Sequence, residues 1–126
     1  MAVIRAEDRF LVIRRSQLVR APGMYCFPGG AIEPGESEEQ ALVRELAEEL
    51  AVAGRPVRRL WESVTPWGVH LAWWLAEVND PAAIAPQPAE VESCHWLTAA
   101  EIRQLPQLLA SNVEFLDAWE QGLEPR

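Results

Sequence analysis

The sequence has few cationic residues, and this scarcity bears on which partners it can bind. It holds 11 lysine and arginine residues against 19 aspartate and glutamate residues, so its formal net charge is -8. Affinity for a nucleic-acid backbone comes from clustered lysine and arginine. We therefore expect no nucleic-acid partner, and an anionic substrate would need metal ions as intermediaries.

Cysteine, long apolar runs and a recognisable export signal are also scarce or missing. Cys26 and Cys94 are far apart without metal-ligand spacing, which predicts two buried or half-buried thiols rather than a disulfide. No apolar run approaches the roughly 20 residues that span a bilayer. The amino terminus lacks a basic segment followed by an apolar stretch and a cleavage site. We therefore expect a cytoplasmic protein with no membrane partner.

The length and composition predict one globular domain covering residues 1–126. The chain is 126 residues long and 49% hydrophobic, which is enough for a single core. Segments rich in valine, isoleucine, leucine and tryptophan alternate with turn residues and predict strands. The predicted strands are Ala2–Ile4, Phe10–Arg14, Tyr25–Phe27, Val57–Val64, His70–Val78 and Val91–Leu97, with a hairpin turn at Glu7–Arg9 and a proline-rich loop over Pro81–Pro88.

Helix starts are indicated by capping boxes, in which a serine or threonine is followed three residues later by glutamate or glutamine. Such pairs are Ser37 with Gln40, Thr98 with Glu101, and Ser111 with Glu114. The last pair would open a helix that ends at Gly122. Together these elements predict a sheet covered by helices in an α/β layered domain, although the patterns do not define the strand order.

Glutamates are concentrated on one side of the first predicted helix. If the helix starts near Ser37, Glu45, Glu48 and Glu49 fall within about a third of its circumference. Glutamates three and four residues apart repel by roughly 0.2 to 0.5 kcal/mol per pair, so we expect something cationic among them. Mg2+ and Mn2+ prefer oxygen ligands and leave positions for substrate phosphates. The helix therefore predicts a divalent-metal site for phosphoryl chemistry.

The segment Phe27–Gly30 precedes this helix and carries paired glycines. Their bare backbone can approach a ligand closely or contribute a carbonyl to a metal. The alternative is a tight turn from strand to loop.

From Gly30 onward the polar residues follow a long and specific spacing. The pattern is Gly30, Glu36, Arg44-Glu45-Leu46, Glu48-Glu49 and Ala51-Val52. This pattern resembles the Nudix box, and the flanking strands and chain length resemble small MutT-type members of that family. The resemblance implies a Nudix α/β/α sandwich, with a mixed sheet and a catalytic helix after the glycine-rich loop. One position departs from it, because Ala51 stands where the family usually has glycine. A left-handed backbone there would cost on the order of 1 kcal/mol.

The resemblance also implies roles for residues of the box. Glu48 and Glu49 would bind Mg2+ or Mn2+, together with the carbonyl of Gly29. Glu45 would bind metal or accept the proton of the attacking water. Arg44 and Glu36 would pair and brace the loop against the helix.

The resemblance also implies roles for residues outside the box, from less specific sequence signals. Glu90 would be a further metal ligand or the base, with Glu92 in reserve. Arg14 would contact substrate phosphates, with Arg15 facing the other way. Asn112 would read a purine base, which Phe27 and Trp67 would flank by stacking, while Gly30 would allow the substrate to approach.

Members of this family hydrolyse nucleoside diphosphates linked to another group. The leading hypothesis is therefore a nucleoside triphosphate pyrophosphohydrolase that releases monophosphate and pyrophosphate, with oxidised guanine nucleotides as the specific guess. The alternatives are an ADP-ribose or sugar-nucleotide pyrophosphatase and a non-catalytic Nudix-fold nucleotide sensor. We expect a small-molecule nucleotide substrate and a monomer or homodimer.

Overall fold

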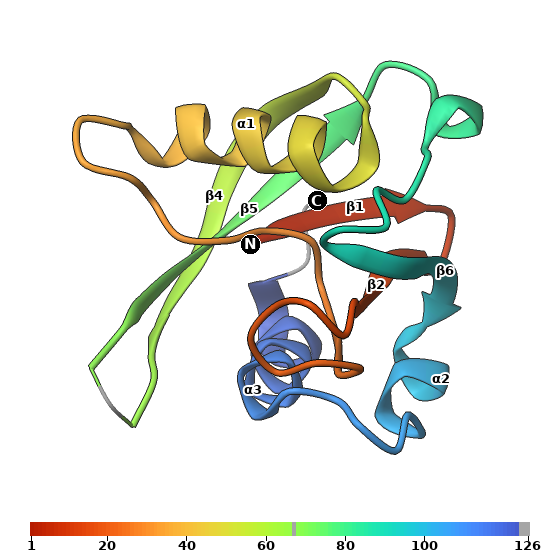
Figure 1. The fold of residues 1–126 in the computed structure, drawn as a ribbon. Helices are drawn as coiled ribbons and strands as arrows, with labels where there is room; N and C mark the ends of the chain where they lie inside the picture. Colours follow the sequence, from red (N-terminus) through yellow and green to blue (C-terminus); the bar gives the residue numbers. More distant parts are fainter. Residues whose placement is uncertain (67, 124–126) are drawn as a thin grey trace.

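A mixed β-sheet lies between helices in the computed structural model, which describes residues 1–66 and 68–123 (Figure 1). The strands are β1 (Ala2–Ala6), β2 (Arg9–Arg15), β3 (Tyr25–Cys26), β4 (Gly54–Val64), β5 (His70–Val78) and β6 (Val91–Thr98). The helices are α1 (Glu38–Leu50), α2 (Ala99–Arg103) and α3 (Ala110–Ala118), with a short 3₁₀ turn at Pro81–Ala83 and a π-helical turn at Trp119–Leu123.

The sheet order is β3-β2-β1-β5-β4, and β6 pairs along β2. The β1–β5 pairing is parallel, whereas β1–β2, β2–β3, β2–β6 and β4–β5 are antiparallel. The β2–β6 ladder runs from Arg9 opposite Thr98 to Arg15 opposite Val91. Strand β2 therefore lies at the centre of three pairings and ends beside the segment that enters β6.

Two hydrophobic layers cover the two faces of this sheet. Ile4 and Ile13 belong to the layer that contains Leu46 of α1. Val3 and Val12, their neighbours along the strands, belong to the layer that contains α3. Because side chains alternate across a strand, each strand supplies both layers. The predicted α/β/α arrangement with a mixed sheet is confirmed.

Tryptophan and phenylalanine fill the layer beneath α3. The rings of Trp73 and Phe115 are stacked with centroids 4.5 Å apart. Phe27 meets Phe115 at 5.3 Å, edge to face, and is fully buried. These rings leave the backbone after β3 tightly enclosed.

The predicted strands agree closely with the observed ones. The largest difference is in β4, which begins at Gly54 rather than Val57. The capping boxes of Ser37 and Thr98 are both present. The third prediction is wrong, because α3 begins after Leu109 without a side-chain cap and Ser111 lies inside the helix.

Both cysteines are free thiols, Cys26 buried and Cys94 partly buried, as predicted. Among the described residues, no helix is long and apolar enough to cross a membrane.

Candidate metal and pyrophosphate site

Helix α1 carries most of the candidate site and has a defined conformation at both ends. The Ser37 side chain accepts from the Gln40 amide at 3.1 Å, and the Gln40 side chain accepts from the Ser37 amide at 2.9 Å. At the other end Ala51 adopts a left-handed conformation with φ 52° and ψ 38°. The helix thus ends as the family glycine would end it, with the strain of a β-carbon accepted.

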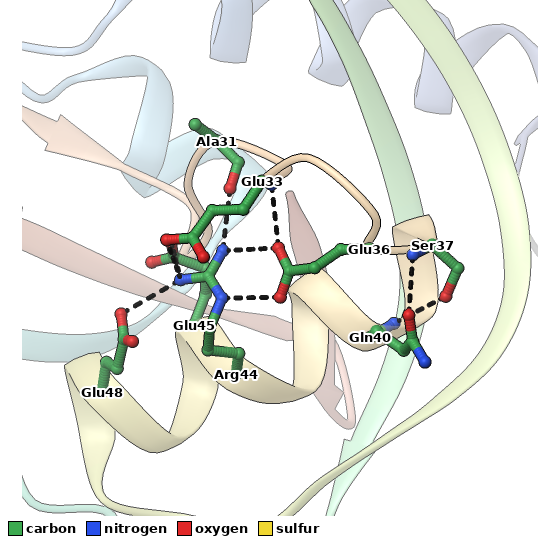
Figure 2. Close-up of polar contacts among 8 residues, drawn as sticks. All are labelled: Ala31, Glu33, Glu36, Ser37, Gln40, Arg44, Glu45 and Glu48. Carbon is green, nitrogen blue, oxygen red and sulfur yellow. Dashed lines mark hydrogen bonds and ion pairs between the residues drawn. The ribbon is translucent and has the colours of Figure 1, made fainter.

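Arg44 connects the loop before α1 to the glutamates on the helix (Figure 2). Its Nε and Nη2 donate to the two carboxylate oxygens of Glu36 at 2.7 and 2.9 Å. Its Nη2 also donates to the Ala31 carbonyl at 2.9 Å. Its Nη1 donates to Glu45 at 2.8 Å and to Glu48 at 3.2 Å. The Arg44 guanidinium therefore supplies some of the positive charge expected among the glutamates. Its hydrogen bonds lower the pKa of Glu36 to about 2.

Two carboxylates of α1 and one from a segment distant in the sequence converge next to Arg44. One oxygen from each of Glu45, Glu48 and Glu90 lies within 4.8 Å of the other two. Glu90 reaches this position because the preceding loop is tied to α1, where the Gln87 amide donates to the Glu49 carbonyl at 2.9 Å. On the other side, the Ser16 amide donates to the Glu90 carbonyl at 3.0 Å. The structure therefore places Glu90, which lies outside the box, next to the glutamates of α1.

Glu49 lies deeper than this cluster and faces the glycine loop. Its side chain is only 4% exposed, and its Oε1 accepts a hydrogen bond of 2.9 Å from the Gly29 amide. Gly29 has φ 145°, a conformation that L side chains rarely adopt. The glycine loop is therefore held against the helix by the buried carboxylate.

The electrostatics of the site favour a bound cation. Burial raises the pKa of Glu49 to about 8, and the negative charges of Glu45 and Glu90 add to this rise. Burial also raises the pKa of Glu45, against the lowering effect of Arg44. A divalent cation would offset both effects. The donor set is all oxygen, as Mg2+ and Mn2+ require, so the residues present fit such an ion.

The two arginines at the end of β2 have different neighbours. Arg14 donates to the Gly23 carbonyl at 3.1 Å and pairs with Glu92 at 3.2 Å, so the predicted phosphate contact and the reserve acid lie against each other. The Nη1 of Arg15 lies 4.0 Å from the Cys26 sulfur, and its Nε donates to the Arg20 carbonyl at 2.6 Å. Its charge partly opposes the rise that burial causes in the pKa of Glu49. Arg15, which sequence reasoning set aside, is therefore the strand-end arginine on the side of the carboxylates.

The predicted base-binding residues need correction. Phe27 is buried among core rings and exposes no face on which a base could stack. Asn112 is also fully buried, and its Oδ1 already accepts the Phe27 amide hydrogen at 2.9 Å. Trp67 lies outside the described residues. No pattern in the sequence indicated that Phe27 and Asn112 would be buried, because that depends on how α3 packs against the sheet.

Comparison with known proteins identifies the family. The NUDIX domain family matches residues 1–119. The chain is 32% identical over 122 residues to the CTP pyrophosphohydrolase of Escherichia coli, covering 94% of this chain and 87% of that protein. The chain belongs to the Nudix family, as the box predicted.

Two further similarities extend this result. The chain is 33% identical over 113 residues to the NAD-capped RNA hydrolase NudC of Deinococcus radiodurans, but it spans only 39% of that protein's length. A crystal structure of a MutT protein from Methanosarcina mazei matches with a TM-score of 0.79 and 22% identity, covering 95% of this chain and 89% of that one. The structural similarity supports the fold alone, whereas the two named relatives support a pyrophosphohydrolase as the class of enzyme.

Proposed function

We propose that this Nudix domain is a Mg2+- or Mn2+-dependent pyrophosphohydrolase that cleaves a nucleoside triphosphate into monophosphate and pyrophosphate. The observation that carries the proposal is the convergence of Glu45, Glu48 and Glu90 within 4.8 Å beside the buried Glu49. A domain that only sensed nucleotides would have no need to keep four acids together against their mutual repulsion.

The metal ligands in this proposal are Glu45, Glu48 and Glu49 with the Gly29 carbonyl, and Glu90 completes the acidic cluster beside them. The bound ion would supply positive charge to the phosphate oxygens and make water more acidic. Arg44 holds Glu45 and Glu48 in place through its Nη1 bonds of 2.8 and 3.2 Å. Glu36 in turn fixes Arg44 through two parallel hydrogen bonds, which set the orientation of the guanidinium plane.

We assign proton removal from the attacking water to Glu90. Glu45 accepts a hydrogen bond from Arg44, which stabilises its ionised form as a ligand. Within the described residues, no hydrogen bond to the Glu90 carboxylate competes with water. Because both acids lie in the same cluster, the pH dependence of kcat in E45Q and E90Q decides between them: the variant that has lost the base loses the acidic limb of the profile.

For the substrate, the match to CTP pyrophosphohydrolase along nearly the whole of both chains favours a nucleoside triphosphate. The specific guess of oxidised guanine nucleotides depended on Arg14 and Asn112, of which Arg14 pairs with Glu92 and Asn112 is buried against the Phe27 amide. A dinucleotide pyrophosphatase is the second candidate, because the chain also matches NudC. Arg15 replaces Arg14 as the proposed contact for substrate phosphates.

The test is a substrate panel with product identification in Mg2+ and in Mn2+. The panel contains CTP, dCTP, an oxidised dGTP, ADP-ribose, NAD and NAD-capped RNA. We expect monophosphate and pyrophosphate from a triphosphate, with E48Q as the inactive control. Preferred cleavage of NAD or ADP-ribose would support the second candidate, and turnover of no compound in either metal would reject the enzyme proposal.

A further inference from the structure

Asn112 lies in the first turn of α3 and contacts a backbone group far away in sequence. Its Oδ1 accepts a hydrogen bond of 2.9 Å from the Phe27 amide, 85 residues away. Its Nδ2 donates to the hydroxyl of the neighbouring Ser111 at 3.2 Å. Asn112 is fully buried, so both ends of its amide are used inside the protein.

The Phe27 amide needs this acceptor because the strand ends just before it. Strand β3 stops at Cys26, and the strand partner of that residue is Ile13. A buried backbone amide without an acceptor is costly, and buried amides are almost always paired. The Phe27 ring also packs against Phe115, three residues beyond Asn112 in α3. Helix α3 therefore fixes both the backbone and the side chain of Phe27.

The two residues after Phe27 connect this anchor to the metal site. The Pro28 carbonyl accepts from the Ala2 amide at 2.7 Å. The Gly29 amide then donates to Glu49 at 2.9 Å. The segment Phe27–Gly29, which bridges the side chains of Asn112 and Glu49, is thus short and hydrogen-bonded at each residue. A displacement of the Phe27 backbone would be transmitted to Gly29, since no free residue lies between them.

We propose that Asn112 is a positioning residue for the glycine loop, and that it does not read the base of the substrate. Its amide fixes the Phe27 backbone, and this places Gly29 against Glu49 and Gly30 beside Glu45. The catalytic consequence of this role rests on the proposed function. Base reading would require Asn112 to release Phe27 and to become exposed, whereas positioning requires it to stay as it is.

The two roles differ in what a substitution changes. Asn112→Leu keeps a similar volume but removes the acceptor. If Asn112 positions the loop, the substitution should weaken Mn2+ binding and lower kcat about tenfold, by the same factor for pyrimidine and purine substrates. The amide hydrogens of Phe27 and Gly29 should exchange faster. If Asn112 reads the base, the substitution should instead raise KM for nucleotides of one base and leave Mn2+ affinity and amide exchange unchanged.

Three variants of the full chain serve as controls. Asn112→Asp keeps the acceptor oxygen and should retain slow exchange at Phe27 and most of the Mn2+ affinity. Ser111→Ala removes only the contact at Nδ2 and should behave as wild type. Leu116→Ala opens the same buried layer without touching the loop. It should lower the melting temperature while Mn2+ affinity below that temperature stays unchanged.

The measurements are Mn2+ titration by electron paramagnetic resonance, amide exchange by NMR, and kcat and KM for CTP and oxidised dGTP. Unchanged Mn2+ affinity in N112L, or a base-selective rise in KM, would overturn the proposal. If N112L does not fold, N112D decides, because loss of its Mn2+ affinity and amide protection would count against positioning. If the wild type cleaves no nucleotide, the proposed function fails, while the Mn2+ and exchange measurements still test the role of Asn112.

Discussion

Gly30 and Glu45 are in such close contact that no side chain fits between them. A β-carbon on Gly30 would lie 2.5 Å from Cδ and Oε1 of the Glu45 side chain. Glu45 cannot easily retreat, because Arg44 holds its carboxylate at 2.8 Å. A side chain at residue 30 would therefore force the Glu45 carboxylate to move. This contact explains on steric grounds why the box begins with glycine.

Gly30→Ala should impair catalysis more than folding. The added carbon displaces the Glu45 carboxylate, and a misplacement of about 1 Å in a catalytic group costs roughly a hundredfold in rate. We expect kcat to fall about ten- to a hundredfold and Mn2+ to bind more weakly, with a small change in melting temperature. Gly35→Asn is the control, since nothing lies within 4 Å of Gly35 and asparagine is strained less than other side chains at its φ of 85°. Wild-type kinetics in G30A would show that the contact has no catalytic importance.

The buried Glu49 should make the metal-free protein less stable as pH rises. Its pKa is raised from 4.5 to about 8, so the unfolded chain releases this proton at lower pH than the folded protein does. Stability contributed by this group is therefore complete below pH 4.5 and is lost as pH rises toward 8, by an amount on the order of a few kcal/mol. Denaturant unfolding of metal-free protein between pH 5 and 8.5 measures this slope.

Glu49→Gln tests the same relationship, because glutamine cannot ionise. The variant should match or exceed wild-type stability at pH 8 without metal, while turnover falls by orders of magnitude. Mn2+ should raise the melting temperature of wild type more at pH 8 than at pH 5, because it binds the ionised form. A pH slope that persists unchanged in E49Q would assign it to another group.

Arg15 should matter more for substrate binding than Arg14. A charged hydrogen bond to a phosphate is worth about 1.5 to 3 kcal/mol. Arg15→Ala should therefore raise KM about ten- to a hundredfold for every nucleotide. Arg14→Ala removes the pair with Glu92 on the opposite side of the strand and should change KM little. Equal effects of the two variants on steady-state kinetics would contradict this assignment.

Ala51→Gly should stabilise the protein. Ala51 has φ 52°, and glycine adopts that conformation without the cost of a β-carbon, which is on the order of 1 kcal/mol. We expect the melting temperature to rise by roughly 3 to 6 °C with unchanged kcat. Ala47→Gly on the exposed side of α1 is the matched control and should destabilise by roughly 0.5 to 1 kcal/mol. Destabilisation by A51G would mean that the strain is relieved in some other way.

Local patterns were sufficient for most of the fold. Alternating apolar residues located all six strands, and the capping-box spacing located the starts of α1 and α2 correctly. The same spacing failed at Ser111, because α3 begins where the chain leaves its backbone contacts with Tyr25. A tertiary contact therefore decided where that helix starts.

The candidate site divides in the same way. The glutamates lie on one helix, so the sequence alone placed Glu45, Glu48 and Glu49 on one side of it. The hydrogen bonds from Arg44 to Glu45 and Glu48 were found only in the structure. Glu90 was placed only by family resemblance, and the loop contact between Gln87 and the α1 backbone brings it there in the structure.

By itself, then, the sequence determined the acidic helix, its cap and the family chemistry, because these depend on spacing within one continuous segment. Tertiary structure decided which of Arg14 and Arg15 faces the carboxylates, and it buried Phe27 and Asn112. Alternation along a strand gives two opposite faces but does not say which helix will cover each. That choice depends on how α1 and α3 pack against the sheet, through contacts between residues far apart in the chain.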